Sequence, residues 1–513
     1  MLQNFPNTHT AKPEIIILSS PAISDYAFIL LYIAEKNVTF VGNFVSFFRF
    51  LLRISVFVAL KIGNFRSSKL NLMMKKTIVA ALIAALSPMT VSAEGYQINT
   101  LSAKQNGMGH TGTALHLGAE SQIFNPAGMG WLDKPFELSA SVSPIFATAK
   151  ATLKDGASYT TDNKAATPMS INVGFSIYDN LKAGIAFYTP YGSSINWTDN
   201  WPGADLNQSV SLKTFTIQPS VAWKITPKLS VGAGLMITWG TVDLNKGLVS
   251  PLGFDAMMQQ IVPGYPSIGS TVPASVNLKG NAHPRLGVNV GVMYDINDQW
   301  TVGANFRQEM MMRVKAGEAS VRYASREIES VLEPTLGLIN SAEFSAKMPC
   351  AAVYNAGVSY RPIRPLVIAF DVQFTQWSAY KQLDIEFLNP DLSRFDQNIP
   401  KNYHDSWTFH LGAQYSLTNR FDIRAGMMLD TSPVDKNHYN PETPGMTKIE
   451  PSVGFSFRPI DMLSIDLGLL YVAGLGADDR SCTYKDFILG ERKFEADYSV
   501  HAFCPSIGLT LNL

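Results

Sequence analysis

Apolar and polar residues alternate with a period of two through most of the chain beyond residue 135. The alternation is clearest in the runs 229–239, 421–429 and 463–471, where every second residue is apolar and most of the others are polar or glycine. Successive side chains of a β-strand point to opposite faces. These runs therefore predict strands with one face in lipid and the other in a lumen lined by polar or small residues. The last run, 507–513, alternates to its end but finishes on Leu513, where barrel chains usually have an aromatic residue.

Short turns join these runs in pairs, and much longer segments separate the pairs. Short turns on one side and long loops on the other are typical of outer-membrane barrels. Six short turns imply about fourteen strands with both chain ends on the periplasmic side; these turns are 179–180, 226–228, 297–299, 362–365, 418–420 and 459–461.

A soluble β-sandwich would alternate as well. The length of the strands favours the membrane, as do the aromatic residues near their ends, such as Trp223, Trp239, Trp300, Phe421 and Tyr471. A closed barrel is the form of sheet that leaves no unpaired edge in lipid. The predicted fold class is therefore all-β, a transmembrane antiparallel β-barrel formed by residues 135–513.

The N-terminal part contains an internal secretion signal. Residues 73–93 comprise the basic pair Lys75-Lys76, an apolar stretch and the small-residue site Val91-Ser92-Ala93, as in a signal peptide. Residues 1–72 precede it and contain apolar runs. They could be a membrane anchor, but we favour an over-extended start that is not part of the native protein, because two consecutive targeting signals have no evident purpose.

Composition excludes several classes of function. Charged residues make up 16% of the chain, and 41 Lys and Arg balance 41 Asp and Glu, so no basic field argues for nucleic acid. The mean hydropathy of +0.05 is too low for a bundle of membrane helices. Of the three cysteines, Cys482 and Cys504 could bridge an outer loop in an oxidising compartment, whereas Cys350 is expected to stand alone in a strand.

The segment 94–134, ahead of the first predicted strand, is rich in Gly, Ala and Asn and shows no sustained alternation. A segment of this size either hangs in the periplasm or plugs the lumen. Its motifs resemble the N-terminal hatch of the FadL family of outer-membrane transporters for long-chain fatty acids and other hydrophobic compounds. The residues that carry this likeness, and that we predict to form the hatch, are Gly95, Tyr96, Gln97, Gly107, Gly109, Gly112, Asn125, Pro126 and Ala127.

Two further segments, 188–192 and 439–445, are similar to the irregular third strand of that family and to the segment after its eleventh strand. The resemblance covers essentially the whole mature chain, and fourteen strands is the family's number. It implies a monomer in the Gram-negative outer membrane that works without a cofactor. A hydrophobic ligand such as a fatty acid would diffuse passively from the outer surface to an interior pocket and leave sideways into the membrane lipid.

The sideways exit is predicted at Pro190 and Gly192. Proline has no N–H to donate to the strand ladder, and glycine tolerates strained dihedral angles, so pairing should fail locally. Equally, Pro190 could simply end the strand at the outer rim.

The third and fourth long loops contain more apolar residues than exposed loops should. Flexible Met side chains would suit a groove for ligands of variable shape; the alternative is that the two loops pack on each other as a lid. The predicted ligand-binding residues are Leu252, Phe254, Met257, Met258, Ile261, Val331, Leu332 and Leu336.

Other motifs carry no function in this context. Gly107, Gly109 and Gly112 have the spacing of a dinucleotide fingerprint, but no βαβ unit surrounds them. His404 and His410 could suggest a barrel lipase, yet no nucleophile motif or metal-ligand spacing accompanies them. The sequence thus predicts a transporter rather than an enzyme; a lipid-acting enzyme and a general diffusion pore are the alternatives.

Overall fold

The computed structural model describes residues 95–199 and 201–513. The predicted signal peptide and residues 1–72 lie outside them. Within this described part, no helix is long and apolar enough to cross a bilayer.

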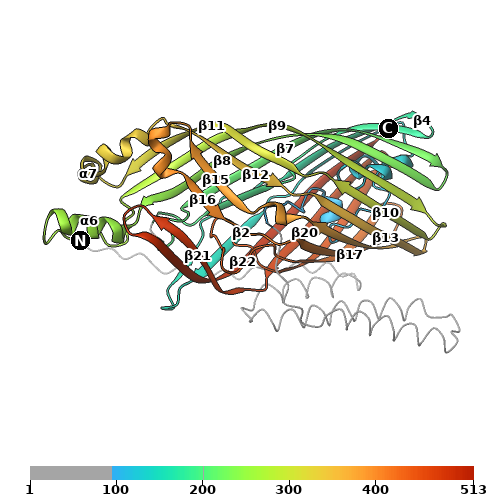
Figure 1. The fold of residues 1–513 in the computed structure, drawn as a ribbon. Helices are drawn as coiled ribbons and strands as arrows, with labels where there is room; N and C mark the ends of the chain where they lie inside the picture. Colours follow the sequence, from blue (N-terminus) through green and yellow to red (C-terminus); the bar gives the residue numbers. More distant parts are fainter. Residues whose placement is uncertain (1–94, 200) are drawn as a thin grey trace, which may run out of the picture. The chain divides into compact units, whose positions relative to one another are not determined.

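Fourteen strands form one closed antiparallel barrel, in which β1 also pairs with β22 through Leu138 and Leu511. Strands β7, β8, β9 and β22 are the longest and continue beyond their neighbours toward the end that carries α6 and α7 (Figure 1). In their order around the barrel the strands are β1 (Phe136–Val142), β4 (Met169–Tyr178), β5 (Leu181–Tyr188), β7 (Ser209–Thr226), β8 (Leu229–Val249), β9 (Ala274–Asp295), β10 (Trp300–Arg307), β13 (Val353–Ile363), β14 (Leu366–Thr375), β17 (Ser406–Ser416), β18 (Phe421–Asp430), β19 (Lys448–Ile460), β20 (Leu463–Gly474) and β22 (Gly490–Asn512).

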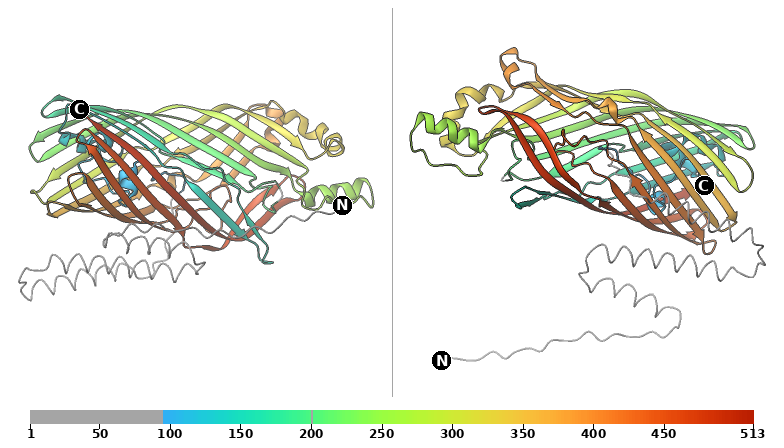
Figure 2. Two further views of the ribbon diagram at one scale, coloured as in Figure 1. Left: turned by 180° about the vertical axis from the view of Figure 1, so that it is seen from behind. Right: turned by 60° about the horizontal axis from the view of Figure 1, so that its bottom comes forward.

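The remaining strands extend the wall or its loops at the end of the barrel away from the C-terminus (Figures 1 and 2). They are β2 (Phe146–Thr152), β3 (Ser158–Thr160), β6 (Gly192–Asn196), β11 (Met310–Tyr323), β12 (Glu343–Cys350), β15 (Gln382–Phe387), β16 (Gln397–Pro400) and β21 (Ala477–Asp486). The helices are α4 (Ala103–Asn106), η1 (Gly118–Glu120), α5 (Ser121–Phe124), η2 (Pro126–Trp131), α6 (Pro251–Ile261), α7 (Arg326–Leu336), η3 (Gly337–Ile339), η4 (Trp377–Ala379) and η5 (Pro390–Phe395).

The expected strand count and all six short turns are confirmed. Each turn joins two consecutive barrel strands, as Pro227 and Lys228 join β7 to β8. Five of the fourteen strand paths are interrupted partway along and resume as β2, β6, β11, β12 or β15. The alternation in the sequence did not reveal these interruptions; only the one between β5 and β6 lies where Pro190 and Gly192 indicated a local failure of pairing.

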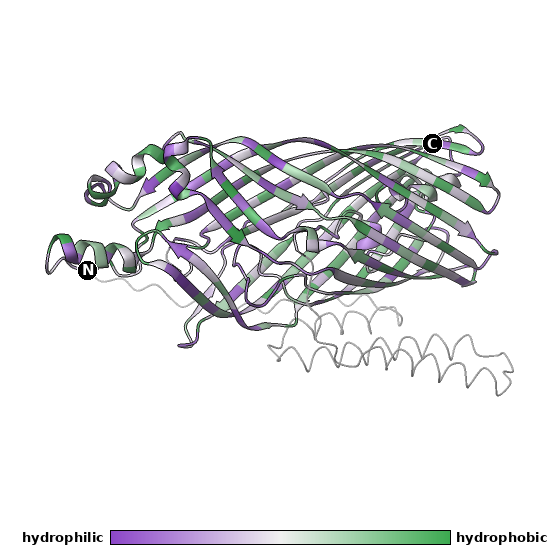
Figure 3. Cartoon of the chain, viewed as in Figure 1, coloured by the Kyte–Doolittle hydropathy of each residue, from purple (hydrophilic) through white to green (hydrophobic). Residues whose placement is uncertain are grey.

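In the part of the wall nearest the short turns, the exposed row of the strands is the apolar one, as the alternation predicts. On β9, Leu286, Val288 and Val290 are exposed, whereas Asn289 between them is completely buried. Hydrophobic and hydrophilic residues accordingly alternate along the strands (Figure 3). The outward rows explain how the barrel resides in lipid, and the buried rows face the lumen.

All three cysteines are free and buried. Cys482 on β21 lies opposite Phe494 of β22, ten residues before Cys504 on that strand. At about 3.3 Å per residue this separates the two thiols by about 33 Å, far more than a disulfide spans. The bridge considered between Cys482 and Cys504 therefore does not form, while Cys350 stands alone at the end of β12.

Candidate functional site

Residues 95–134 fill the lumen at the end of the barrel that carries the C-terminus (Figure 1). Their backbone touches the backbone of the wall, so side chains would not fit. A Cβ on Gly107 would lie 2.5 Å from the Cα of Gly454, and one on Gly109 would lie 2.6 Å from the carbonyl oxygen of Leu411. Gly109 also has a φ of 61°, which favours glycine. These two glycines thus explain why the predicted hatch motif is rich in glycine.

The Asn-Pro-Ala triplet ties this segment together and to the wall. The Asn125 side chain caps η2 by accepting from the N–H of Ala127 at 3.1 Å, and Pro126 begins that helix. The Asn125 amide donates to the carbonyl oxygens of Thr113, within the segment, and of Val292, on β9, at 2.8 and 3.1 Å. One buried side chain therefore satisfies three backbone groups, which few residue types could do.

Buried carboxylates hold the segment from both sides. Asp371 of β14 accepts hydrogen bonds from the N–H groups of Gly112 and Thr113 at 2.7 and 2.9 Å. Glu120 accepts from the hydroxyls of Ser102 and Ser139, each at 2.7 Å. Charge-assisted bonds of this kind are among the strong ones, so the segment is anchored.

An aromatic cluster surrounds Tyr96 near the start of the described chain. Its ring lies 4.7 Å from that of Trp377 and 5.9 Å from that of Tyr380, both edge-on, and 6.0 Å from that of Tyr191. Its hydroxyl donates to the carbonyl oxygen of Pro349. Sequence reasoning missed Trp377 and Tyr380, because they lie in and directly after the short helix η4 between β14 and β15 with no recognisable motif.

The third barrel strand is interrupted where the sequence has Pro190. Strand β5 ends at Tyr188, and its path resumes as β6 at Gly192. The first hatch residues lie beside the gap: Gln97 forms an isolated antiparallel bridge with Tyr191. Pro190 thus interrupts the strand partway along and does not end it at the rim.

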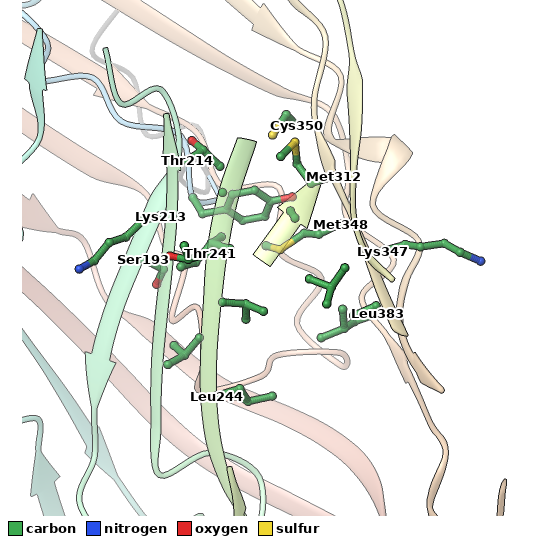
Figure 4. A pocket seen from close by; sticks show the side chains of 18 of the residues that line it. Ser193, Lys213, Thr214, Thr241, Leu244, Met312, Lys347, Met348, Cys350 and Leu383 are labelled. Atoms are coloured by element: carbon green, nitrogen blue, oxygen red, sulfur yellow. The ribbon is translucent and has the colours of Figure 1, made fainter. Parts of the chain in front are cut away.

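An apolar cavity of about 90 Å³ lies inside the lumen beside Tyr96 (Figure 4). The side chains of Lys213 and Lys347 point away from the space, although both residues belong to its wall (Figure 4). Glu442 at its edge forms an ion pair with Lys401, which is fully buried. The cavity therefore offers hydrocarbon contacts; the residues that supply them include Val210, Leu212, Val242, Leu244, Ala282, Met312, Val314, Ala346, Met348, Cys350 and Leu383.

A smaller polar cavity of about 30 Å³ lies next along the hatch, lined by Gln97, Asn99, His110, Arg307 and His410 among others. The Arg307 guanidinium donates to the carbonyl oxygen of Ile123 at 2.9 Å. Its Nε and the Nε2 of His110 have no partner among the described residues. Buried polar groups of this kind call for water or a polar ligand group. Arg313 and Lys315, two cations on β11, are exposed instead.

The predicted loop residues lie apart from both cavities. Phe254 and Met258 on α6, and Leu332 and Leu336 on α7, are buried in one apolar cluster with the outer ends of β8, β9 and β11. Met257 is partly buried against the same cluster. Leu252, Ile261 and Val331 are exposed, at 58%, 61% and 38%. The two helices therefore show both a packed face and an exposed apolar face.

Comparisons with known proteins agree with this architecture. Residues 83–511 match the family described as outer membrane protein transport protein (OMPP1/FadL/TodX). The long-chain fatty acid transport protein of Escherichia coli K12 is 23% identical over 417 residues, which cover 78% of this chain and 92% of that protein. A FadL homologue of Pseudomonas aeruginosa superposes with a TM-score of 0.69 at 18% identity, over 82% of this chain and 99% of the homologue. The toluene transporter TodX of P. putida gives a TM-score of 0.60 at 13% identity, over 81% and 99%.

Proposed function

Because the chain belongs to the OMPP1/FadL/TodX family of outer membrane transport proteins, we propose that it carries hydrophobic small molecules across the outer membrane by passive diffusion. The observation that supports this most directly is the apolar cavity beside Tyr96. Similar proteins are named for long-chain fatty acids and for toluene. A space lined by aliphatic and Met side chains suits hydrocarbon of either kind. A monomer suffices, since the barrel closes on itself.

The polar cavity would receive the head group of a fatty acid. Tyr96 lines the apolar cavity, and the next residue, Gln97, lines the polar one. A carboxylate near Arg307 could accept from its unpartnered Nε while the alkyl chain lies against Met312 and Met348. A neutral aromatic compound would use the apolar cavity alone.

Entry would begin at the outer loops. The exposed apolar face of α6, with Leu252 and Ile261, and Val331 on α7 supply the surface on which a ligand would first be captured. The buried residues of both helices hold that surface in place. The ligand groove and the lid, the two alternatives for these loops, would then be the exposed face and the packed face of the same helices.

Release would occur sideways at the interruption of the third strand. Around Pro190 the wall lacks some of the backbone hydrogen bonds that join neighbouring strands. The hatch residues 96–98 lie beside this gap. Movement of these residues would join the lumen to the membrane lipid without opening a water-filled channel. A general diffusion pore, by contrast, needs an open lumen, and a segment that fills the lumen would block it.

Ligand binding by the purified barrel tests the proposal. We expect a fatty acid and a neutral hydrocarbon to bind, and mass measurement to find a hydrophobic compound co-purifying. Leu244→Gln should weaken binding about tenfold or more, because it places an unpartnered amide, costing about 1–3 kcal/mol, in the cavity. Leu252→Gln tests capture by the loops, and Leu475→Gln, at the same 58% exposure in another loop, is its control.

Three outcomes would contradict transport by this route. Unchanged binding and uptake in Leu244→Gln would exclude the cavity from the path. Large and steady ion conductance of the wild-type protein in planar bilayers would favour the pore instead. Release of product from phospholipid would favour the enzyme.

A further inference from the structure

Two cations face each other on the outer surface of the barrel wall. Arg313 on β11 lies directly opposite Lys347 on β12, and both residues are exposed. The Lys347 side chain points away from the lumenal cavity (Figure 4). Like charges directly opposite each other destabilise a strand pair. The sheet therefore has a local repulsion that something outside the chain would relieve.

Another cation on the same wall has acidic residues of the chain opposite it. Lys279 on β9 lies opposite Asp243 of β8 on one side and Glu318 of β11 on the other. The side chains of Arg313 and Lys347, in contrast, take part in no ion pair or hydrogen bond within residues 95–199 and 201–513. The repulsion is thus specific to this pair.

The neighbouring strands carry charges of both signs, and cations outnumber acids on β9 and β11 near the pair. Lys315 on β11 and Arg285 on β9 are exposed near the pair. On the other side, β15 carries two acids, Glu386 opposite Ser345 and Asp384, which accepts hydrogen bonds from Gln382 and Asn398 at 2.8 and 2.9 Å. In the part of the chain that the structure describes, neither acid forms an ion pair with Lys347. The patch on β9, β11 and β12 therefore keeps a net positive charge.

The position of Arg313 and Lys347 along the barrel axis places them at the level of the lipid head groups. Trp300 begins β10 next to a short turn, and its ring stacks on that of Tyr360 at 4.2 Å. Arg313 follows thirteen residues later along the same strand path, which at about 3.3 Å per residue and about 40° tilt is about 33 Å. The apolar band of such barrels is about 25 Å tall. Arg313 and Lys347 thus lie just beyond its outer edge.

We propose that Arg313 and Lys347 bind a phosphate group of a lipid in the outer leaflet of the outer membrane. Arginine and lysine side by side provide several N–H donors for phosphate oxygens, and the guanidinium can bind in a bidentate way. A lipid phosphate converts the repulsion between the two cations into two attractions. This site depends on the membrane location of the barrel and not on which ligand the barrel carries.

Native mass spectrometry of the purified barrel with lipid A tests the site. The double variant Arg313→Gln/Lys347→Gln should bind bisphosphorylated lipid A about 25-fold more weakly, since each cation near anionic lipid contributes about fivefold. Dephosphorylated lipid A should bind wild type and variant equally. The matched control is Lys154→Gln/Lys493→Gln, which removes two exposed lysines paired with Glu495, and it should bind as wild type does. Equal binding by the test variant, or an equal loss in the control, would overturn the proposal.

Thermal unfolding separates lipid binding from a structural role. In detergent without phosphorylated lipid, the double variant should unfold at or above the wild-type temperature, because the repulsion is gone. Adding bisphosphorylated lipid A should raise the wild-type midpoint and leave that of the variant unchanged. A lower midpoint of the variant under both conditions would mean that the two residues serve the fold alone, and would also overturn the proposal.

Discussion

The backbone N–H of Gly192 donates a hydrogen bond to the carbonyl oxygen of Tyr96, 2.9 Å away, and the N–H of Ile98 donates to Pro190 over the same distance. These two bonds flank the bridge between Gln97 and Tyr191. The first described residues of the hatch therefore act as a ladder partner where Pro190 interrupts the third strand. The hatch and the gap in the wall form one structural unit.

Cross-linking this unit should block release of the ligand. Gln97 and Tyr191 form a non-hydrogen-bonded antiparallel pair, whose Cα atoms are typically about 4.5 Å apart, within the range of a disulfide. In a background with the native cysteines replaced by alanine, oxidised Gln97→Cys/Tyr191→Cys should take up ligand at least about tenfold more slowly. Reductant should restore uptake, and each single cysteine variant should be insensitive to oxidant. Full uptake by the cross-linked protein would rule out release beside residues 96–98.

Tyr96→Ala should weaken ligand binding while leaving the barrel folded. The substitution removes a buried ring from the cluster with Trp377 and Tyr380, and a buried aromatic-to-alanine change costs about 3–5 kcal/mol. We expect this loss to loosen the hatch start and enlarge the apolar cavity, seen as weaker ligand binding in a fluorescence titration. Tyr178→Ala removes a ring that is 67% exposed at a short turn and should bind as wild type does.

Gly426→Val should displace the hatch from the wall. A Cβ at position 426 would lie 2.1 Å from the backbone nitrogen of Gly109, and backbone cannot yield as a flexible side chain would. We expect higher ion conductance in planar bilayers, because the lumen would no longer be filled. Gly156→Asn is the control: nothing lies within 4 Å of its Cβ, and asparagine tolerates the left-handed conformation found there. Unaltered conductance of Gly426→Val would mean that the hatch fits without this close approach.

Asp371→Ala should weaken the anchor of the hatch more than Asp371→Asn does. Alanine leaves the buried N–H groups of Gly112 and Thr113 without their acceptor, at about 1–3 kcal/mol each, whereas asparagine retains one side-chain oxygen. Hydrogen exchange followed by mass spectrometry should show faster exchange at residues 112 and 113, in the order alanine, asparagine, wild type. If the alanine variant exchanges at the wild-type rate, Asp371 is not the anchor.

Cys482 should resist alkylation in the folded protein. Burial in the outer hairpin raises the pKa of its thiol from the usual value near 9 to about 12. The reactive thiolate is lost as a thiol pKa rises, so at pH 8 its fraction should fall by about three orders of magnitude. Peptide mapping after iodoacetamide treatment should find position 482 unlabelled in the folded state and labelled after unfolding. Rapid labelling of the folded protein would show that the hairpin opens.

The sequence alone determined the barrel. Alternation along the strands and the six short turns are local properties, and a closed sheet is the form in which such strands satisfy their backbone in lipid. The hatch motif could also be recognised from the sequence, because positions 107 and 125 have requirements that few residues other than Gly107 and Asn125 meet.

Only the tertiary structure decided where the cavities lie, which cations face outward and where the wall is interrupted away from Pro190. Trp377 meets Tyr96 across 281 positions of the chain, and Arg313 meets Lys347 through the register of two strands. Period-two alternation tells which face a residue occupies, but not which residue of the neighbouring strand lies opposite it. That pairing depends on bulges and interruptions, which change the register without changing the local pattern.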